Sequence, residues 1–274
     1  MRATLHNHTI CSDGTQTVKD LNNLALEKNF DIVAITDHDT VDGYFDILKL
    51  DTPVRFIIGV EMSTVHRGKN VHVLGYFPSI DFDTIKYFQK LKKDRIRRCK
   101  MMLENLEKYE NIFINYEDVE KLANGVVGRP HIAEAISLKY GVSRDDVFKK
   151  YIGNDCRSYV NVGKISTKDA VKFLKERGAI VSLAHPIQIK GFEFEEILDF
   201  GFDAIEVNHP DQNDEYRKML RNVAERYNLI VTGGSDYHGN THSHYFDSSY
   251  IEGEDLDIFL SKFDNLEHKN TINK

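Results

Sequence analysis

The residues best suited to chemistry lie close to the start of the chain, in the stretch LHNHTICSDG, residues 5–14. His6 and His8 are separated by one residue, and Asp13 follows five residues after the second histidine. Imidazole and carboxylate groups are common metal ligands, and they are also common in polar turns. Taken alone, the stretch leaves both interpretations open.

Histidines and acidic residues recur after, or within, short apolar segments that are typical of buried strands. These are His38 in ITDHDT, Glu61 in IIGVEMS, His72 in NVHVLGY, His185 in LAHP, His209 in EVNHP, and Asp236 with His238 in GGSDYHG. A single histidine at a strand end is more often a hydrogen-bonded structural residue than a ligand. Recurrence on every expected strand favours one shared site.

The elements that must position these residues follow from hydrophobic periodicity. Apolar runs alternate with amphipathic segments, which predicts a mostly parallel α/β sheet or barrel. We expect seven strands, near residues 2–6, 31–36, 54–60, 70–76, 179–185, 203–209 and 229–236. One helix should begin after Thr17, an N-cap with Asp20 three residues later. Another should run from Ser166 to Arg177 and end at Gly178.

The middle of the chain breaks this alternation. Residues 79–163 contain no convincing buried strand, and their apolar residues recur at helical spacing. We therefore expect an all-helical insertion over residues 79–163 that covers the active site. The barrel itself would be built from residues 1–78 and 164–274.

In an α/β barrel the C-terminal ends of the strands meet at one mouth, where active sites lie. Nitrogen and oxygen donors without thiolates suit Mn²⁺, Fe²⁺ or Zn²⁺. Nine or so ligands of these types exceed the roughly four to six that one ion takes, so we expect two to three divalent ions. A cluster at a barrel mouth leaves coordination positions open for water and substrate, as in a catalytic centre.

Other residues of the same types are expected to lie outside the site. His66, His242, His244 and His268 have polar neighbours in the sequence and are interpreted as surface residues. Cys11 lies between His8 and Asp13, and we interpret it as a packing residue because oxygen and nitrogen donors are abundant.

Composition narrows the class of protein. The 274 residues are 41% hydrophobic and 29% charged, and the formal net charge is −7, which argues against a protein that coats nucleic acid nonspecifically. The three scattered cysteines form no disulfide framework, and neither a signal peptide nor a long apolar span is present. We expect a cytoplasmic protein that contacts no membrane and has no evident obligate protein partner.

The motifs together resemble those of the PHP family, the polymerase-and-histidinol-phosphatase metallohydrolases. They are LHNHTICSDG, ITDHDT, GVEMS, VHVLGY, LAHP and GSDYHG, and they occur in order over nearly the whole chain. The closest likeness is to the branch with nucleoside 3′,5′-bisphosphate phosphatases and 5′→3′ exoribonucleases. The resemblance implies a distorted seven-stranded TIM-like (β/α) barrel with a trinuclear metal centre.

The resemblance also divides the ligands among three ions. The first ion would be held by His6, His8, Glu61 and Asp236, with Glu61 bridging to another. The second would be held by Asp13, His38 and His185. The third would be held by Glu61, His72 and His238.

Two segments of the expected insertion carry further candidates. GRPHIAEAI, residues 128–136, resembles a segment that folds back over the metal site, where Arg129 would contact the substrate phosphate. His131 and His209 are further substrate-binding candidates. An Arg–carboxylate pair and a helix-terminal contact are the structural alternatives for Arg129 and His131. The basic run KKDRIRRCK, residues 92–100, is either a solvated helix face or a guide for an oligonucleotide backbone.

The implied reaction is hydrolysis of a phosphomonoester or of a terminal phosphodiester by a hydroxide that bridges two metals. The substrate would be a small nucleotide or a short RNA, and His209 is a candidate for the general acid. A histidinol-phosphate-type phosphatase, a non-catalytic PHP module and a metal-dependent amide hydrolase are the alternatives. The intact ligand set and the absence of a strand-end lysine argue against the last two.

Overall fold

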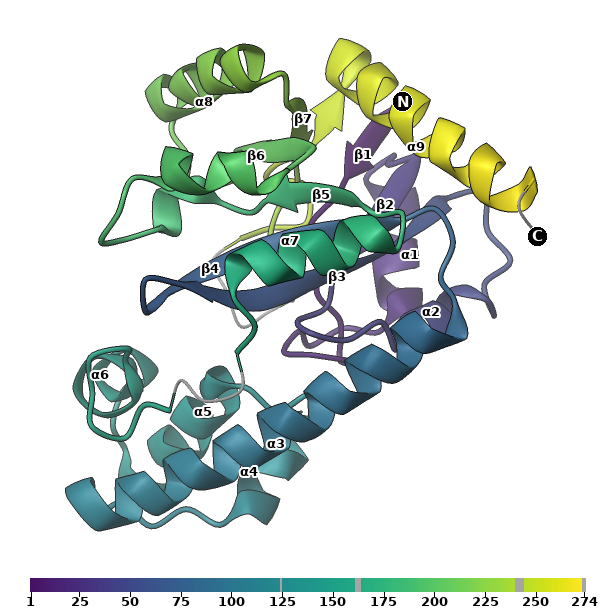
Figure 1. The fold of residues 1–274 in the computed structure, drawn as a ribbon. Helices are drawn as coiled ribbons and strands as arrows, with labels where there is room; N and C mark the ends of the chain where they lie inside the picture. Colours follow the sequence, from purple (N-terminus) through teal and green to yellow (C-terminus); the bar gives the residue numbers. More distant parts are fainter. Residues whose placement is uncertain (124, 161–163, 240–243, 273–274) are drawn as a thin grey trace.

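The computed structural model describes residues 1–123, 125–160, 164–239 and 244–272, with side chains to residue 266. Its centre is one eight-stranded sheet, curled into a nearly closed barrel, in the order β7-β6-β5-β4-β3-β2-β1-β8 (Figure 1). The strands are β1 (Arg2–Thr4), β2 (Ile32–Ile35), β3 (Arg55–His66), β4 (Lys69–Phe77), β5 (Ile180–Leu183), β6 (Ala204–Asn208), β7 (Ile230–Gly233) and β8 (Ile251–Glu252). The expected α/β barrel is confirmed.

Backbone hydrogen bonds join the segment after β1 to the end of β7 and the segment that follows it. The N–H of Leu5 donates to the carbonyl of Gly233 at 3.0 Å, and the N–H of His8 donates to the carbonyl of Tyr237 at 2.8 Å. A Cβ atom on Gly234 would lie 2.3 Å from the backbone nitrogen of His6. Only glycine allows this approach, which brings the chain after β7 against the chain after β1.

Most strand pairs are parallel, as expected, but β4 runs antiparallel to both β3 and β5. The reason is local. Arg67 and Gly68, with φ of +47° and +73°, form a two-residue turn between the paired residues His66 and Lys69. Two central residues with positive φ are typical of a β-hairpin turn, which reverses the chain direction.

Strand lengths also differ from expectation. β3 continues to His66, well past the predicted end at residue 60, because its second half pairs with β4 along the hairpin. β8 was not predicted, and it pairs antiparallel with β1 through only two residues. So short a strand leaves little periodic signal in a sequence.

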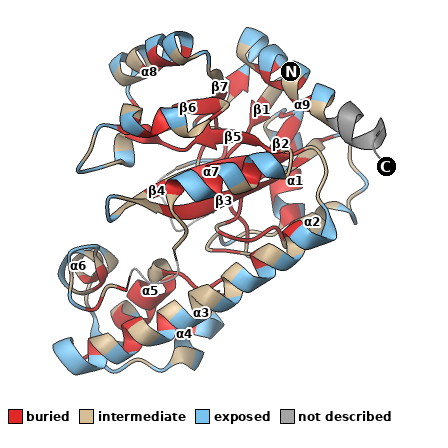
Figure 2. Cartoon of the chain, viewed as in Figure 1, coloured by how far each residue is buried: buried red, intermediate tan, exposed pale blue. Residues whose placement is uncertain are grey.

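Helices cover the outside of the barrel (Figure 1), and the buried residues concentrate on the strands that they enclose (Figure 2). They include α1 (Val18–Glu27), α2 (Tyr44–Ile47), α7 (Thr167–Glu176), α8 (Asp214–Tyr227) and α9 (Gly253–Ile272), with 3₁₀ turns η2 (Pro186–Gln188) and η3 (Phe194–Phe200). The predicted starts of α1 and α7 are confirmed. Thr17 and Ser166 each cap their helix with the side-chain oxygen, which accepts the N–H of Asp20 and of Asp169.

A group of helices lies to one side of the barrel (Figure 1). It consists of α3 (Phe82–Glu110), α4 (Tyr116–Ala123), α5 (Arg129–Tyr140), α6 (Arg144–Val147) and the short π-helix η1 (Phe148–Ile152). These helices share an apolar cluster of their own, to which Met102, Leu106, Ile132 and Val147 contribute fully buried side chains. The described part of residues 79–163 contains no strand.

Within the residues that the structure describes, none of the helices combines the length and the apolar character that crossing a membrane requires.

Candidate metal centre

Glu61, which is 1% exposed, lies at the centre of a ring of histidines. Its Oε2 atom lies 3.3 Å from Nε2 of His6, 3.2 Å from Nε2 of His8 and 3.0 Å from Nδ1 of His38. Its Oε1 atom lies 2.9 Å from Nδ1 of His72 and 2.9 Å from Nε2 of His185. One carboxylate therefore contacts five imidazoles, and its two oxygens face different groups of them.

Two aspartates complete the cluster on the side away from His72. Oδ1 of Asp236 lies 3.4 Å from Nε2 of His6 and 3.2 Å from Nε2 of His8. Asp13 lies 3.3 Å from Nε2 of His238 and 3.8 Å from Nε2 of His38. All nine ligands predicted from the sequence thus lie within one continuous cluster.

The cluster divides into groups whose donor atoms lie within 4.8 Å of one another. One group is His6, His8, Glu61 and Asp236, the set that the resemblance implied for the first ion. A second contains Asp13, His38 and His238 together with His8, and a third contains His38, Glu61 and His72. His238 therefore lies with Asp13, and His185 lies with Glu61 and His72, the reverse of the division implied by the resemblance.

The sheet order explains this exchange. β5 is hydrogen-bonded to β4, so His185 at the end of β5 lies beside His72 of β4. The segment after β7 closes against the segment after β1, where Asn7 and Tyr237 form a parallel bridge. His238 consequently reaches the loop that carries Asp13.

Antiparallel β4 brings His72 to the same mouth from an early position in its strand. His72 pairs with Ser63 across the β3–β4 hairpin, and Ser63 is two residues beyond Glu61. Alternate residues of a strand share a face, and directly paired residues share one as well. Glu61 and His72 therefore point to the same side of the sheet.

Two of the ligands have a backbone conformation that non-glycine residues seldom adopt. His185 has a φ of +24° and Asp236 a φ of +49°. Such conformations are costly and persist where the surrounding structure enforces them, often at functional sites. Both residues lie within three residues of a strand end, where the chain turns toward the cluster.

Glu206, which sequence reasoning missed, forms hydrogen bonds with two of the predicted ligands. Its Oε1 accepts a hydrogen bond from Nδ1 of His6 at 2.9 Å, and its Oε2 accepts the backbone N–H of His185 at 2.7 Å. A carboxylate that holds the far nitrogen of a ligand histidine fixes the ring's orientation and tautomer. The signal available in the sequence was an acidic residue within the otherwise apolar strand AIEVN.

Asp37, also missed, organises the loop that carries His8 and Asp13. It accepts hydrogen bonds from the backbone N–H of Thr9 at 2.7 Å, the Thr9 hydroxyl at 2.7 Å and the Ser12 hydroxyl at 2.6 Å. Burial raises the pKa of Asp37, although these hydrogen bonds oppose that shift. Its position directly before His38 in ITDHDT was the only indication in the sequence.

The donor atoms of the cluster fit divalent metal ions. Several are buried and form no hydrogen bond although they lie close together, namely Nε2 of His6, both ring nitrogens of His8, Nδ1 of His38, Oδ1 of Asp13 and Oε2 of Glu61. Buried polar atoms nearly always have a hydrogen-bonding partner. A group of such atoms without one is therefore expected to bind an additional partner. Imidazole and carboxylate donors in this arrangement suit a divalent cation.

The electrostatics of the cluster show the same requirement for positive charge. Burial alone would raise the pKa of Glu61, but His38, His72 and His6 outweigh it and hold that pKa well below its ordinary value. Burial alone would lower the pKa of His8, but the close contacts with Asp236 and Glu61 raise it to about 10. The buried carboxylates are thus stable as anions only beside positive charge, which metal ions can supply.

The cluster opens into a cavity of about 460 Å³, a volume suited to a small-molecule ligand. Predicted metal ligands line one side of the cavity, including Asp13, His38, Glu61, His72, His185, Asp236 and His238. Side chains of the helical segment line the other side, among them Arg95, Arg98 and Arg129. The basic run 92–100 therefore does not form only a solvated face, because two of its arginines face the metal cluster.

Arg129 lies at the start of α5 and reaches the cavity wall. Its Nη1 donates to Oδ1 of Asn154 at 2.8 Å and to the carbonyl of Ile152 at 3.3 Å. Its guanidinium group lies over the rings of Phe148 and Tyr159, at 5.8 and 5.1 Å from their centroids. Neutral partners hold the side chain, so its charge is available to an anion in the cavity.

The other two substrate-binding candidates, His131 and His209, are both buried, and His209 forms a further group of possible metal donors with Asp236 and His244. His131 is buried, and its Nδ1 accepts the N–H of Gly128 at 3.0 Å, a contact at the start of α5. His209 is completely buried and does not line the cavity. Its Nδ1 accepts the N–H of Asp211 at 3.2 Å, so Nε2 carries the proton and faces Oδ2 of Asp236 at 3.4 Å.

Two histidines assigned to the surface lie elsewhere. His244 lines the cavity and is 2.9 Å from Oδ1 of Asp211. His66 packs against the rings of Phe192 and Phe200. Polar neighbours in the sequence do not reveal such contacts, because they come from η3, the segment before it and the loop between β6 and α8. His242 and the side chain of His268 lie outside the described residues.

Cys11 takes no part in the metal-binding groups found among the described residues. Burial, with a smaller effect of Asp37, raises the pKa of its thiol to about 12. A thiol with so high a pKa is a poor ligand and a poor nucleophile at neutral pH.

The chain is similar to curated proteins with activity on phosphate esters. Residues 4–143 match the PHP domain. The chain is 29% identical to a 5′-3′ exoribonuclease of Haemophilus influenzae, over 93% of this chain and 94% of the relative. It is 30% identical to the 5′-3′ exoribonuclease Rnm of Salmonella typhimurium, over 85% and 84%. It is 27% identical to a 3′,5′-nucleoside bisphosphate phosphatase of Chromobacterium violaceum, over 85% and 86%.

A solved structure from Bifidobacterium adolescentis, provisionally described as a metal-dependent phosphoesterase, has the same fold. The TM-score is 0.82 at 27% identity, and the match covers 95% of this chain and 96% of the other.

Proposed function

Since the chain belongs to the PHP family, we propose that it is a metal-dependent phosphoesterase that hydrolyses phosphate esters of nucleotides. Its substrates would be nucleoside 3′,5′-bisphosphates or the 5′ ends of short RNAs. The observation that carries this proposal is Glu61, which contacts five histidines at the end of a cavity whose other wall carries Arg129. Relatives with both activities support the choice of substrate class.

The donor set has room for two to three divalent ions of Mn, Fe or Zn. His6, His8, Glu61 and Asp236 would hold the first, Asp13, His38 and His238 the second, and Glu61, His72 and His185 the third. Such ions, when bound, supply a water of lowered pKa as nucleophile and positive charge for the phosphoryl oxygens. Both effects suit a reaction whose transition state is stabilised mainly by electrostatics.

The chain's own residues orient and hold the reacting groups. Arg129 presents a planar set of N–H donors to the substrate phosphate, a geometry that matches phosphate oxygens. Hydrolysis adds water across the P–O ester bond, and the leaving oxygen must gain a proton. In this proposal His209 holds Asp236 through its Nε2 proton, and its assignment as the general acid stays a prediction from the sequence.

A cytoplasmic setting is part of the proposal, and the cysteines support it. Cys11, Cys99 and Cys156 are all free thiols. Free thiols are typical of a reducing compartment, which supports a role in the cytoplasm, where nucleotides and RNA are turned over.

The test is a substrate panel in the presence of Mn²⁺. It compares adenosine 3′,5′-bisphosphate, 5′-phosphorylated oligoribonucleotides, histidinol phosphate and an aryl phosphate. We expect hydrolysis of a nucleotidic substrate, with kcat/KM well above that for histidinol phosphate. A clear preference for histidinol phosphate would favour the small-molecule alternative, and no hydrolysis of any ester by the metal-loaded protein would favour a non-catalytic module.

Variants connect the activity to the site. Asp236→Ala and His38→Ala should each abolish hydrolysis of the aryl phosphate, while Asp83→Asn, an exposed change at the start of α3, should not. Arg129→Met should raise KM for nucleotides more than it lowers kcat. Full activity in Asp236→Ala would place the reaction elsewhere in the molecule.

A further inference from the structure

We propose that His244 is the general acid of this site, which gives a proton to the leaving oxygen of the phosphate ester while Asp211 holds its ring. The inference rests on the proposed function and adds a catalytic residue to it. The group that needs this proton is an alcohol, such as a ribose hydroxyl, because an alcohol leaves far more readily as a neutral molecule than as an alkoxide.

His244 is the end of a chain of three side chains that come from three different segments. Nε2 of His244 donates to Oδ1 of Asp211 at 2.9 Å, and Nε2 of Gln188 donates to Oδ2 of the same carboxylate at 3.1 Å. Asp211 follows β6, Gln188 ends η2, and His244 follows β7. All three line the metal cavity. A carboxylate that accepts from one imidazole nitrogen orients the ring and leaves the other nitrogen for proton transfer.

The ring of His244 lies beside the metal cluster. One of its nitrogens is within 4.8 Å of a carboxylate oxygen of Asp236, and Asp236 is itself 3.2 Å from Nε2 of His8 in the donor group of the first ion. The side chain of His244 is 16% exposed, so the ring is largely shielded from bulk water and still faces the cavity. The leaving oxygen is bonded to phosphorus, and a phosphate held at the cluster therefore brings that oxygen close to His244.

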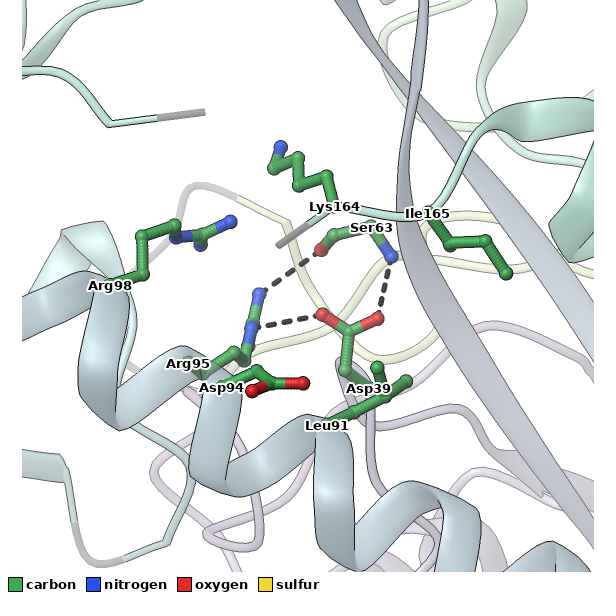
Figure 3. Close-up of a pocket in the computed structure, with 8 residues that line it drawn as sticks. All are labelled: Asp39, Ser63, Leu91, Asp94, Arg95, Arg98, Lys164 and Ile165. Atoms are coloured by element: carbon green, nitrogen blue, oxygen red, sulfur yellow. Dashed lines mark hydrogen bonds and ion pairs between the residues drawn. The ribbon is translucent and has the colours of Figure 1, made fainter. Parts of the chain in front are cut away.

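Few other groups on the cavity wall are suited to give up a proton. Metal ligands bind in their deprotonated form, and guanidinium groups such as that of Arg129 keep their protons. Lys164 lies beside Arg98 in the pocket along α3 (Figure 3) and donates to Oδ1 of Asn70 at 2.6 Å. Among the described residues that line the cavity, His244 is the one histidine outside the predicted ligand set.

The hydrogen bonds around His244 favour proton transfer over a further metal site. Donor atoms of His209, Asp236 and His244 lie close enough together to hold a cation. However, Nδ1 of His209 accepts the N–H of Asp211 at 3.2 Å, so Nε2 carries the proton that faces Asp236. His209 therefore offers no free nitrogen to an ion, and Nε2 of His244 is already directed at Asp211.

The proposed step conserves protons and electrons. The attacking water gives one proton to solvent, and its oxygen forms the new bond to phosphorus. The ester P–O bond breaks, its electron pair stays on the leaving oxygen, and the Nδ1 proton of His244 moves to that oxygen. The alcohol leaves as a neutral molecule, and the neutral imidazole recovers from solvent the equivalent of the proton that the water released.

The experiment compares substrates that differ in their need for this proton. Adenosine 3′,5′-bisphosphate and glycerol 2-phosphate release an alcohol, whereas the leaving oxygen of 4-nitrophenyl phosphate departs readily as an anion. The variants are His244→Asn, which keeps an N–H donor for Asp211 without a transferable proton, Asp211→Asn, and His209→Asn for the candidate suggested by the sequence. Controls are Asp214→Asn, an exposed change at the start of α8, and His66→Asn, a histidine that does not line the cavity.

We expect His244→Asn to lower kcat/KM for the two alkyl esters by about 100-fold or more, the size typical of general acid catalysis, and to leave 4-nitrophenyl phosphate nearly unaffected. Asp211→Asn should show the same selectivity with a smaller loss, and the controls should show none. Equal losses on alkyl and aryl esters would show that His244 binds the phosphate, and no loss would show that it takes no part. A selective loss in His209→Asn alone would assign the acid to His209. Each of these three results overturns the proposal.

Two further measurements separate an acid from a ligand or a structural residue. Elemental analysis should find the wild-type metal content in His244→Asn, and the loss of an equivalent would identify His244 as a ligand and overturn the proposal. Added imidazole should restore part of the activity of His244→Ala on glycerol 2-phosphate, which a structural role does not predict.

The substrates also separate this inference from the proposed function. If the wild-type protein hydrolyses glycerol 2-phosphate and 4-nitrophenyl phosphate but no nucleotide, the proposed substrate class fails, and the comparison of these two esters still tests His244. If it hydrolyses nucleotides while His244→Asn loses no selectivity between alkyl and aryl esters, the inference alone fails. A metal-loaded wild type that hydrolyses none of the esters overturns both.

Discussion

Nδ1 of His6 donates a hydrogen bond to Oε1 of Glu206 across 2.9 Å, and both side chains are completely buried. Burial would raise the pKa of Glu206, but the attraction and hydrogen bond of His6 lower it, so Glu206 is an anion that can only accept. The proton of His6 is therefore on Nδ1, and Nε2 faces Glu61 and Asp236. One carboxylate outside the ligand set thus determines which nitrogen of His6 is offered to a metal.

Replacing Glu206 with glutamine should weaken the metal centre while leaving every ligand in place. An amide no longer fixes the tautomer of His6, and losses of about 10–100-fold in metal affinity or activity are typical of such changes. Competition with a chelator would measure the affinity, and steady-state kinetics the activity. Glu215→Gln, an exposed change on α8, is the matched control. Wild-type affinity in Glu206→Gln would contradict this role.

The purified protein should contain two to three equivalents of Mn, Fe or Zn by elemental analysis. Glu61→Gln should reduce that content most strongly, because Glu61 contacts donors of more than one group. Ions that bind only the folded state also stabilise it, so chelation should lower Tm and added Mn²⁺ should restore it. A metal-free protein with an unchanged Tm would contradict the assignment of the cluster.

The pair of Arg95 and Asp39 should contribute strongly to stability, because it joins α3 to the loop that carries His38. The two side chains are only 11% and 8% exposed, and Asp39 also accepts the N–H of Ser63 at 2.7 Å. Removing one partner of a buried pair typically costs about 3–5 kcal/mol. Urea unfolding of Arg95→Met would measure the loss. The double variant Arg95→Met/Asp39→Asn should be less destabilised than the sum of the single variants, and strict additivity would show that the pair is not coupled.

Asp203 should make the stability of the barrel depend on pH. It accepts hydrogen bonds from Lys175 at 2.9 Å, from Lys262 at 2.8 Å and from the N–H of Val181 at 3.1 Å, which joins α7, α9 and β5. Burial would raise its pKa, but the lysines and the N–H group outweigh burial and lower it. A carboxyl whose pKa is lower in the folded state stabilises the protein above the unfolded-state pKa, near 4.

This contribution is lost as pH falls through the lower, folded-state pKa. Asp203→Asn should therefore reduce the free energy of unfolding by about 1–2 kcal/mol at pH 7, and by progressively less below about pH 4. Chemical unfolding at a series of pH values would measure both effects. The exposed residue Asp214 offers a control in Asp214→Asn. A constant difference between wild type and Asp203→Asn across this range would contradict an ionic role.

Local sequence signals predicted correctly those features that depend on residues close together in the sequence. The capping residues Thr17 and Ser166 begin α1 and α7 as predicted, because a cap depends on residues three positions away. The apolar runs located seven strands, and histidines or acids beside them indicated a shared site. The hairpin at Arg67 and Gly68 escaped notice because the second half of β3 alternates less clearly between apolar and polar residues.

Side chains that meet across the fold were beyond such signals. Glu206 and His244 looked like an isolated acid in a strand and a surface histidine. The contacts that suggest a role for Glu206 and His244 are with residues more than 20 positions away in the sequence. Glu206 contacts His6, and His244 contacts Asp211. Periodicity reports which face of an element is apolar, and it contains no information about which distant element that face meets.

The sequence by itself determined the chemistry available to this protein: nitrogen and oxygen donors beside successive strands, with no thiolate among them. Only the tertiary structure decided how those donors are shared. His238 joins Asp13 because the segment after β7 closes against the segment after β1, and His185 joins His72 because β5 pairs with an antiparallel β4. Ligand types are local properties of the chain, whereas ligand grouping depends on strand order and barrel closure, which long-range hydrogen bonds establish.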